Sequence, residues 1–402
     1  MKVLHVIPSL SAKDGGPSFA MPLMARGLQK AGVTVDVATT FSNAEAALLN
    51  GDPSEPVNRN DVNYHYFRRQ TDFYKVSRPM TRWLARNIGE YDLVHIHALF
   101  SYATSAAANL AIKNRVPYVI RPLGALNRWG MENRRRMLKQ LSFRFVERRI
   151  LTNAAAIHYT SRQEKLEAEQ AGVTTTPFVI PLGIDTSLFQ AGETAARFYQ
   201  RFPNCSGRQI ILFLSRLDQK KGLDILLRAF KEVLAAYPAS LLVIAGDGRT
   251  QFVTELKELA AELGIDGHIV WAGFLNGDDK TAAFAAASVF ALPSYSENFG
   301  LALVEAMAAG LPCVLSDQVG IAPDVVEFEA GSVAPCEVAP LAAALKQLLA
   351  DAELRQRFGE NAVRLANARF SVEAMTGSLV KLYTAIVEQH AAEAGALAVG
   401  VK

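Results

Sequence analysis

Short apolar runs alternate with amphipathic stretches along almost the whole of this 402-residue chain. One series of runs extends from KVLHVIP at residues 2–8 to FVIP at 178–181, and a second extends from QIILFLS at 209–215 to GSVAP at 331–335. Runs that are apolar throughout and alternate with helical patterns are typical of parallel sheets covered on both faces. The sequence therefore predicts an α/β protein with two doubly wound, Rossmann-like sheets.

The alternation of strand and helix patterns is lost between residues 185 and 208, where turn-forming residues gather. We expect a first domain at 1–190, a second at 191–375, and a C-terminal helix and tail at 376–402. The last helical pattern, roughly 371–391, follows all strands of the second domain and is expected to pack back onto the first. Ligands bind beyond the carboxyl ends of parallel strands, so two such domains facing each other would form a cleft.

The three cysteines, Cys205, Cys313 and Cys336, are scattered and lack the spacing of metal ligands. They are expected to be free thiols in a reducing compartment. No apolar run reaches about 18 residues, so no transmembrane helix is predicted. The opening MKVLHVIPSL is interrupted by His5 and Pro8 and has no cleavage-type site after it, which favours a buried strand over a signal peptide. These observations predict a cytoplasmic protein.

The positive charge is concentrated in the first half of the chain. Residues 1–190 hold 24 Lys and Arg against 15 Asp and Glu, whereas the remainder holds 18 against 24. Residues 113–149 alone have eleven basic and two acidic residues, interleaved with Trp129, Phe143 and Phe145. Such a segment can lie on an anionic membrane surface, or it can be the solvated face of an ordinary helix. Nucleic-acid binding is not favoured, because no nucleic-acid motif accompanies the charge.

A glycine pair, Gly15 and Gly16, follows the first predicted strand and precedes Pro17. The three residues predict a tight loop and a helix start, since proline suits the first helical turn. Exposed amides at such a start can bind phosphate, although a plain flexible turn explains the pattern equally well. The spacing of a dinucleotide fingerprint is absent.

Two histidines, His95 and His97, alternate with apolar residues in DLVHIH and so share one face of a strand. His97 falls at the carboxyl end of that strand, where catalytic groups are expected. A core histidine with satisfied hydrogen bonds is the alternative interpretation for both.

Two cations, Arg216 and Lys221, lie in the loop that leaves the first strand of the second domain, before a helix expected near Gly222. Cations at a helix N-terminus oppose the helix dipole, which favours a bound anion such as a diphosphate. A solvated surface pair is the alternative.

Two carboxylates, Glu297 and Glu305, occur eight residues apart in SYSENFGLALVEAMAAG. The helix is expected to begin at Phe299 or Gly300, which places Glu297 in the loop and Glu305 inside the helix. Carboxylates are poor phosphate ligands but good acceptors for sugar hydroxyls, whereas the first helical amides can bind phosphate. The alternative is one helix-capping glutamate and one buried, paired glutamate.

Taken together, these stretches resemble the retaining nucleotide-sugar glycosyltransferases of family 4, the group 1 transferases with the GT-B fold. The resemblance covers most of the chain, including SRLDQKKG, VIAGDG, WAGFL and SENFGLALVEAMAAGLPCVLS, and VIPLGIDTSLF is similar to the interdomain signature of that family. The stretch VIRPLGAL departs from it, because many relatives have a His-Gly pair there. Asn298 and Asp324 also depart from the family pattern.

The resemblance implies a role for each site residue. Arg216 and Lys221 would bind the donor diphosphate, Glu305 the ribose, and Glu297 the transferred sugar, towards which His97 would point. The catalytic residues would be His97, Glu297, Arg216 and Lys221. The remaining donor contacts would come mainly from backbone groups near the phosphate, the sugar and the nucleotide base: Gly15, Gly16, Gly273, Phe274, Asn298, Phe299, Gly300 and Leu301.

The implied reaction moves a hexose from a UDP- or GDP-sugar to a hydroxyl acceptor, with retention of anomeric configuration. The acceptor would be a lipid-linked or growing saccharide in bacterial cell-surface polysaccharide synthesis, and the enzyme would be cytoplasmic or peripheral on the membrane. No Asp-x-Asp motif is visible, so no metal or other cofactor is expected. A sugar-nucleotide epimerase would need a different acid–base set, and a non-catalytic nucleotide-sugar sensor should lack His97 or Glu297.

Overall fold

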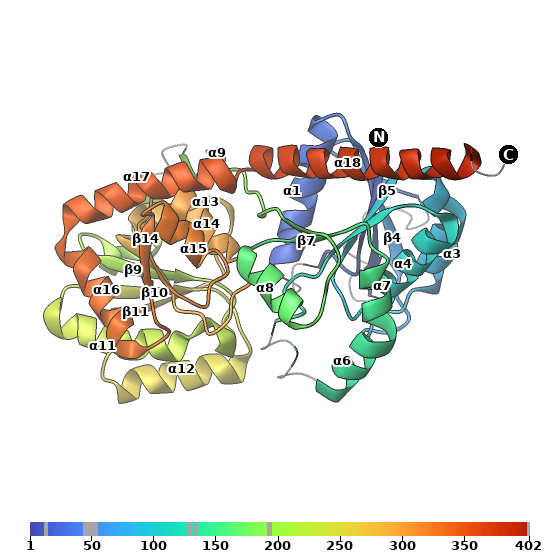
Figure 1. Cartoon of the computed structure of the whole chain (residues 1–402). Coiled ribbons are helices and arrows are strands. Elements are labelled where there is room, and N and C mark those ends of the chain that lie inside the picture. Colours follow the sequence, from blue (N-terminus) through green and yellow to red (C-terminus); the bar gives the residue numbers. More distant parts are fainter. Residues whose placement is uncertain (12–14, 43–54, 128–130, 132–135, 191–194, 400–402) are drawn as a thin grey trace. The chain divides into compact units, whose positions relative to one another are not determined.

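The computed structural model describes residues 1–402 except 12–14, 43–54, 128–130, 132–135, 191–194 and 400–402. The chain forms two compact units, one of Met1–Gly183 with Val372–Lys402 and one of Ile184–Ser371 (Figure 1). The chain therefore passes from one unit to the other at 183/184 and 371/372, whereas the sequence predicted boundaries at 190/191 and 375/376. The two crossing points are neighbours, because Ile184 N–H donates to the Phe370 carbonyl at 2.8 Å and Ile184 bridges Ser371.

The first unit is built on an eight-stranded sheet in the order β3-β4-β2-β1-β5-β6-β7-β8. Its strands are β1 (Lys2–Ile7), β2 (Thr34–Phe41), β3 (Val57–Arg59), β4 (Val62–Arg68), β5 (Leu93–His97), β6 (Tyr118–Arg121), β7 (Ala156–Tyr159) and β8 (Pro177–Val179). All pairs are parallel except β3 with β4. The short antiparallel β3 was not expected, because its Val-Asn-Arg sequence has no apolar run.

The described helices of the first unit cover the two faces of this sheet. They are α1 (Gly16–Lys30), α3 (Arg78–Asn87), α4 (Tyr102–Asn114), α6 (Arg136–Ser142), α7 (Arg148–Thr152), α8 (Arg162–Gln170) and α18 (Val372–Val399), with a 3-10 turn at Ile88–Glu90 and a π-helical turn at Phe143–Glu147. Side chains alternate between the faces of a strand. Leu4 and Val94 thus pack in the apolar core with Leu84 of α3 and Ala107 of α4. The opposite face is polar at its centre.

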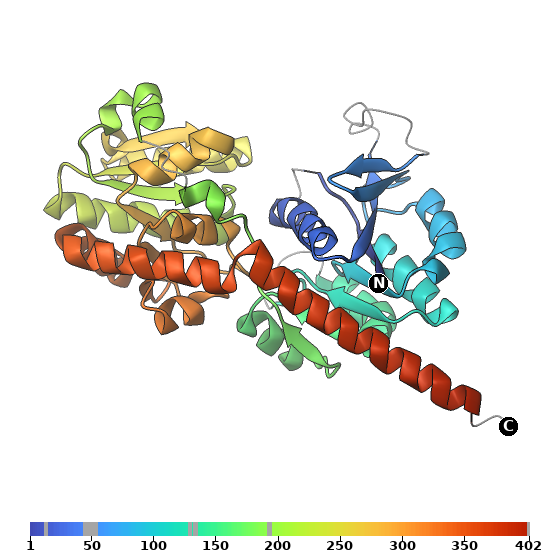
Figure 2. The same ribbon diagram turned by 90° about the horizontal axis from the view of Figure 1, so that it is seen from above.

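The long helix α18 belongs to the first unit and packs against α1 (Figure 2). Gly27 of α1 permits this approach, because a Cβ there would overlap Thr376. The Tyr383 hydroxyl is 2.6 Å from Nδ1 of His95 in the centre of the sheet. The helix ends at Val399, later than the expected 391, because its last turns contain no proline and a single glycine, Gly395, is tolerated inside a helix. None of the helices in the described chain is both long and apolar enough to cross a bilayer.

The second unit holds a six-stranded parallel sheet in the order β11-β10-β9-β12-β13-β14. Its strands are β9 (Ile210–Leu214), β10 (Leu241–Ala245), β11 (Ile269–Gly273), β12 (Val289–Leu292), β13 (Cys313–Ser316) and β14 (Gly331–Ala334). All were expected from their apolar runs. The three cysteines are free, as predicted.

Helices alternate with these strands. They are α9 (Ser187–Gln190), α10 (Ala196–Arg201), α11 (Leu223–Ala236), α12 (Thr250–Glu262), α13 (Gly277–Ala286), α14 (Leu301–Ala308), α15 (Ala322–Glu327), α16 (Val338–Ala350) and α17 (Ala352–Arg369), with 3-10 turns at Pro203–Cys205, Gln219–Lys221 and Asp266–His268. The fold class is thus the expected one, two α/β units with Rossmann-like parallel sheets.

Candidate functional site

Strands β9 and β12 are neighbours in the second sheet, so the loops that leave their carboxyl ends lie side by side. The Tyr295 N–H donates to the Lys220 carbonyl at 2.8 Å, which joins the two loops directly. Gly222 has φ +66° and caps the start of α11, and a Cβ there would overlap the Pro293 carbonyl. The loops after β9 and β12, about 75 residues apart in sequence, therefore pack against each other through their backbones and form one surface.

Glu297 and Lys221 form an ion pair across this surface. Both side chains are largely buried, with 11% and 9% exposed. Burial alone would raise the pKa of the Glu297 carboxyl, but Lys221, Lys220 and the Phe299 backbone N–H lower it overall. The Glu297 backbone is held on both sides, since its N–H donates to Gln318 and its carbonyl accepts from Gly320. The carboxylate is therefore ionised and fixed in position.

Three cations occur in the loop between β9 and α11. Arg216 is exposed, Lys220 is half-buried and Lys221 is buried. Burial lowers the pKa of Lys220, the nearby positive charges of Lys221 and Arg216 lower it further, and Glu297 opposes the change. Sequence reasoning selected Arg216 and Lys221 but missed Lys220. The adjacent Lys-Lys pair was the available signal.

Glu305 lies inside α14, as expected, and forms an ion pair of 2.7 Å with Lys280 of α13. Both groups are partly buried, with 18% and 24% of their side chains exposed. Lys280 was not selected from the sequence, because it occurs in an ordinary helical pattern without a motif. Each of these two carboxylate–ammonium pairs, Glu297 with Lys221 and Glu305 with Lys280, has its carboxylate in SENFGLALVEA.

Helix α14 begins at Leu301 with Gly300 as its N-cap, slightly later than the expected Phe299 or Gly300. Gly300 has φ +88°, a left-handed conformation that glycine adopts without strain and that delays the first helical residue. Phe299 is buried edge-on against Phe370, at 5.6 Å between ring centroids. Its side chain therefore anchors the loop, and its amide supports the Glu297 carboxylate.

Gly273 and Phe274 are further along the same edge, because β11 is separated from β9 by β10. The Gly273 carbonyl accepts a 2.8 Å hydrogen bond from Gly246 N–H. The Phe274 ring is 56% exposed. The predicted contact with a nucleotide base stays a prediction.

Gly15, Gly16 and His97 belong to the first unit. Helix α1 begins at Gly16 after Gly15 with φ +79°, has a proline in its first turn, and has no acidic residue there. The expected helix start is confirmed, whereas residues 12–14 of the expected loop lie outside the described residues. The role of these amides in binding phosphate stays a prediction.

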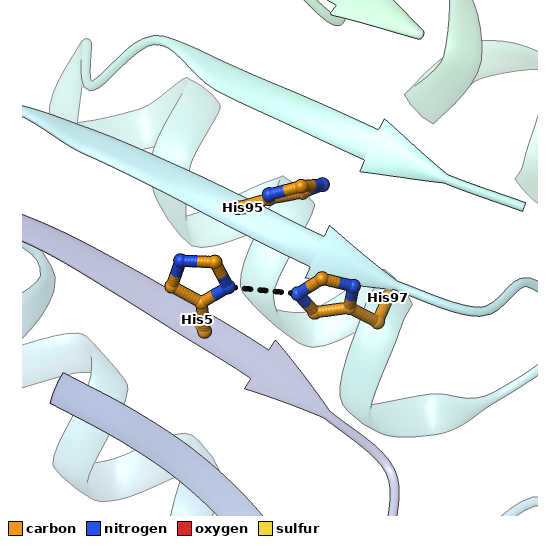
Figure 3. A group of neighbouring side chains, drawn as sticks. All are labelled: His5, His95 and His97. Atoms are coloured by element: carbon orange, nitrogen blue, oxygen red, sulfur yellow. Dashed lines mark hydrogen bonds between the residues drawn. The ribbon is translucent and has the colours of Figure 1, made fainter. Parts of the chain in front are cut away.

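His97 ends β5 and is fully buried with His5 of β1 and His95 (Figure 3). His5 Nδ1 and His97 Nε2 are 2.9 Å apart, and their rings are stacked at 5.2 Å. The strand register places His5 beside His95 on one face, as the alternation predicted for His95 and His97. His97 is thus part of a histidine cluster inside the unit, and whether it contacts a sugar stays a prediction.

His158 of β7 extends this cluster. Burial and then the positive charge of Arg121 lower the pKa of His158 to about 3, so the ring is neutral. Its Nε2 lies 2.7 Å from the Ile180 carbonyl and must donate there, which leaves Nδ1 to accept from His95 Nε2 at 3.3 Å. His95 Nδ1 then accepts from the Tyr383 hydroxyl. The chain of hydrogen bonds has one direction, from α18 into the sheet.

The backbone contact at Gly222 predicts a large cost for Gly222→Ala. The matched control is Gly207→Ala, because Gly207 has a similar φ of +72° but nothing within 4 Å of a Cβ. Gly207→Ala should lower the free energy of unfolding by roughly 1 kcal/mol, the cost of placing alanine in a left-handed conformation. Gly222→Ala should lower the free energy of unfolding by more than this, and thermal unfolding should show a lower melting temperature than that of the control. Equal melting temperatures would contradict the packing described for the two loops.

Because the buried histidines are neutral, we expect the free energy of unfolding to fall as the pH is lowered below the pKa of an unfolded histidine. Burial lowers the pKa of His5 and His158 to about 3, whereas an unfolded histidine titrates near about 6.5. Below that pH the unfolded chain binds more protons, so each histidine lowers the free energy of unfolding by up to about 1.4 kcal/mol per pH unit as pH falls from about 6.5 towards 3.

Thermal unfolding between pH 8 and pH 4.5 measures this dependence. His158→Gln keeps one donor and one acceptor but cannot titrate, so its melting temperature should fall less steeply with acid than that of the wild type. Parallel pH profiles for the two proteins would show that His158 is not held neutral.

The chain is similar to known proteins along most of its length. Residues 198–364 match the family model described as "Glycosyl transferases group 1", and residues 15–183 match the "Glycosyl transferase 4-like domain". An uncharacterized glycosyltransferase of Methanocaldococcus jannaschii is 26% identical over 390 residues, which are 93% of this chain and 95% of that protein.

Two further relatives have described ligands or substrates. A GDP-mannose-dependent alpha-(1-6)-phosphatidylinositol monomannoside mannosyltransferase of Mycolicibacterium smegmatis is 30% identical over 214 residues, 51% of this chain and 55% of that one. The crystal structure of HepE from Anabaena in complex with UDP-glucose has a TM-score of 0.77 at 21% identity, with 96% of this chain and 100% of that one covered. This similarity shows that the fold is GT-B. With one glycosyltransferase model matching in each unit, the chain belongs to the group 1, family 4-type glycosyltransferases.

Proposed function

We propose that this glycosyltransferase moves a hexose from a UDP- or GDP-sugar to a saccharide hydroxyl with retention of anomeric configuration. The observation that carries the proposal is the pair of ion pairs, Glu297 with Lys221 and Glu305 with Lys280, at the carboxyl edge of the second sheet. Each pair offers a carboxylate for hydroxyl groups next to an ammonium for phosphate oxygens. A nucleotide-sugar presents both kinds of group, with hydroxyls on either side of a diphosphate.

In this proposal donor binding changes the partners of the ion-paired side chains. The diphosphate approaches Arg216, Lys220 and Lys221. The positive charges of Arg216 and Lys221 lie close enough to lower the pKa of Lys220. Lys221 then shares its charge between phosphate and Glu297, and the carboxylate accepts sugar hydroxyls. Because Glu297 is already fixed by its backbone contacts, little reorganisation is needed when the donor binds.

Bond cleavage at the anomeric carbon leaves negative charge on the diphosphate, and preorganised cations stabilise that charge. Retaining hydrolases use a carboxylate nucleophile, but here both glutamates are engaged with lysines and serve hydroxyls. We therefore infer a same-face displacement in which the departing phosphate receives the proton of the acceptor hydroxyl. The three cations of the β9–α11 loop supply the positive charge, so the reaction is proposed to need no metal.

A panel of UDP-, GDP- and ADP-sugars tests the proposal, with donor-dependent release of nucleoside diphosphate and thermal stabilisation as readouts. Turnover of one donor in the presence of a saccharide or lipid extract is expected. The names of two relatives, one GDP-mannose-dependent and one solved with UDP-glucose, make UDP- and GDP-hexoses the first to examine. Binding without any turnover would favour a nucleotide-sugar sensor, and interconversion of the donor sugar without transfer would favour an epimerase.

Glu305→Gln is expected to weaken donor binding about 10-fold or more. A hydrogen bond to a charged group contributes about 1.5–3 kcal/mol, and about 1.4 kcal/mol corresponds to tenfold in affinity. Glu258→Gln is the control, since Glu258 is an exposed glutamate on α12. Calorimetric titration with the active donor measures both variants. An unchanged dissociation constant for Glu305→Gln would show that this residue does not hold the ribose.

The acceptor side is proposed to lie at an anionic membrane surface, with the protein cytoplasmic and peripheral. Helix α6 and the π-helical turn after it expose four apolar side chains, Met137 at 83%, Leu138 at 57%, Leu141 at 58% and Phe145 at 67%. Arg136 and Lys139 lie in the same helix, and Arg144 lies in the same π-helical turn. Exposed apolar residues among cations suit the interface of an anionic bilayer, and a lipid-linked saccharide would be presented there.

Sedimentation with vesicles tests this surface. The wild type should bind vesicles containing anionic phospholipid and bind phosphatidylcholine vesicles weakly, because both charge and apolar burial contribute. Leu141→Ser with Phe145→Ser should reduce binding at least several-fold. Leu166→Ser is the matched control, since Leu166 is 51% exposed on α8, outside this surface. Equal binding by the double variant and the control would exclude α6 as the membrane contact.

A further inference from the structure

The first unit encloses a guanidinium that nothing in the described chain neutralises. Arg121 ends β6 and is fully buried, and its Nε, Nη1 and Nη2 atoms have no hydrogen-bond partner among the described residues. Burial lowers the pKa of Arg121 to about 10, so the group keeps its charge at neutral pH. An unpaired buried charge is costly, and structures normally supply it with a partner.

The strand register explains where Arg121 lies. His97 pairs with Arg121 between β5 and β6, and Ile120 pairs with Ile157 between β6 and β7. Side chains of paired residues share a face, so Arg121 lies between His97 and His158 on the polar face of the sheet. His97 and Arg121 are the last residues of their strands, at the carboxyl edge where α/β sheets bind ligands.

The negative charge of Glu164 raises the pKa of Arg121, but the oxygens of this carboxylate are engaged elsewhere. One accepts from Gly124 N–H at 2.6 Å, and the other accepts from the backbone and hydroxyl of Thr160 at 2.7 and 2.9 Å. No ion pair joins Glu164 to Arg121 among the described residues. Within the described part of the chain, the positive charge of Arg121 therefore has no direct counter-ion.

Two neighbouring histidine nitrogens, His97 Nδ1 and His5 Nε2, are also buried without a partner. Ligand atoms of His5, His95 and His97 lie within 4.8 Å of one another, a spacing that a metal ion could use. The buried guanidinium opposes a second cation, however, and it lowers the proton affinity of His5, His97 and His158. The electrostatics of the cluster favour a negative ligand.

We propose that Arg121 and His97 bind an oxyanion, a carboxylate or phosphate group carried by a sugar substrate. Arg121 would donate two parallel N–H bonds to two oxygens of the group. When His5 Nδ1–H donates to His97 Nε2, neutral His97 carries its proton on Nδ1 and can donate a further bond to the oxyanion. Because Arg121 is enclosed, the chain around it must open for the group to enter.

The identification of the carrier as a sugar substrate rests on the proposed function, whereas oxyanion binding at Arg121 does not. Two carriers share this chemistry: a uronic or phosphorylated sugar of the acceptor, and a uronic sugar of the donor. A neutral hexose would leave the guanidinium unpaired and should bind less well.

The experiment compares matched charged and neutral probes with the full-length protein. Glucuronate and glucose 6-phosphate are tested against glucose as acceptor-side probes, and UDP-glucuronate against UDP-glucose as donor-side probes. Titrations are run at constant ionic strength, with chloride as the balancing anion. The wild type is expected to bind the charged member of at least one pair ten-fold or more tightly than the neutral member.

Arg121→Gln should abolish this preference, so that the charged and neutral probes bind within about two-fold of each other. Arg121→Lys keeps the charge but loses the two-pronged geometry, and it should retain only part of the preference. The Lys variant also serves if the Gln variant fails to fold. Binding of UDP itself should be unchanged in either folded variant, because the cations proposed to bind the diphosphate, Arg216, Lys220 and Lys221, belong to the second unit.

Equal binding of charged and neutral probes by the wild type would overturn the proposal, whatever the variants do. A full preference retained in a folded Arg121 variant would also overturn it, since another cation would then be responsible. A preference for glucose 6-phosphate or glucuronate that depends on Arg121, in a protein that binds no nucleotide-sugar, would support the oxyanion site and refute the proposed transferase function separately.

Discussion

Parallel pairing of β9 with β12 brings all the chemistry of the second unit to one edge of its sheet. In a parallel sheet each strand ends at the same side, so loops far apart in sequence become neighbours there. The contact of Gly222 with the Pro293 carbonyl and the bond from Tyr295 to Lys220 hold these two loops together. The ion pair between Lys221 and Glu297 depends on that registration, since its two members come from different loops.

This ion pair explains how acidic residues can lie beside the loop proposed to bind phosphate. A carboxylate near a helix N-terminus would repel phosphate if it stood alone. Paired with a lysine, it instead holds the cation in place and keeps its own charge, as the lowered pKa of Glu297 indicates. The Lys280–Glu305 pair repeats the arrangement on α13 and α14. A ligand with both phosphate and hydroxyl groups can bind both partners of each pair, the lysine through phosphate and the glutamate through hydroxyls.

The first unit places polar groups in its centre for a different reason. Tyr383, His95 and His158 form a directed chain of hydrogen bonds that ties α18 to the sheet. Those bonds satisfy one half of the polar cluster. Arg121 and the free nitrogens of His5 and His97 make up the other half, which has no partner among the described residues. The same face of one sheet therefore combines a structural network with unused hydrogen-bonding capacity.

The sequence by itself determined the fold class and the strands other than β3. It also placed Arg216, Lys221 and Glu297 in loops that follow strands, and Glu305 inside a helix. These follow from local periodicity and turn chemistry, which a single segment carries. The partners Lys280, Lys220 and Tyr383, the burial of His97 and the isolation of Arg121 came only from the tertiary structure. Side-chain pairing and burial depend on which strands are neighbours and in what register, and no local pattern encodes either.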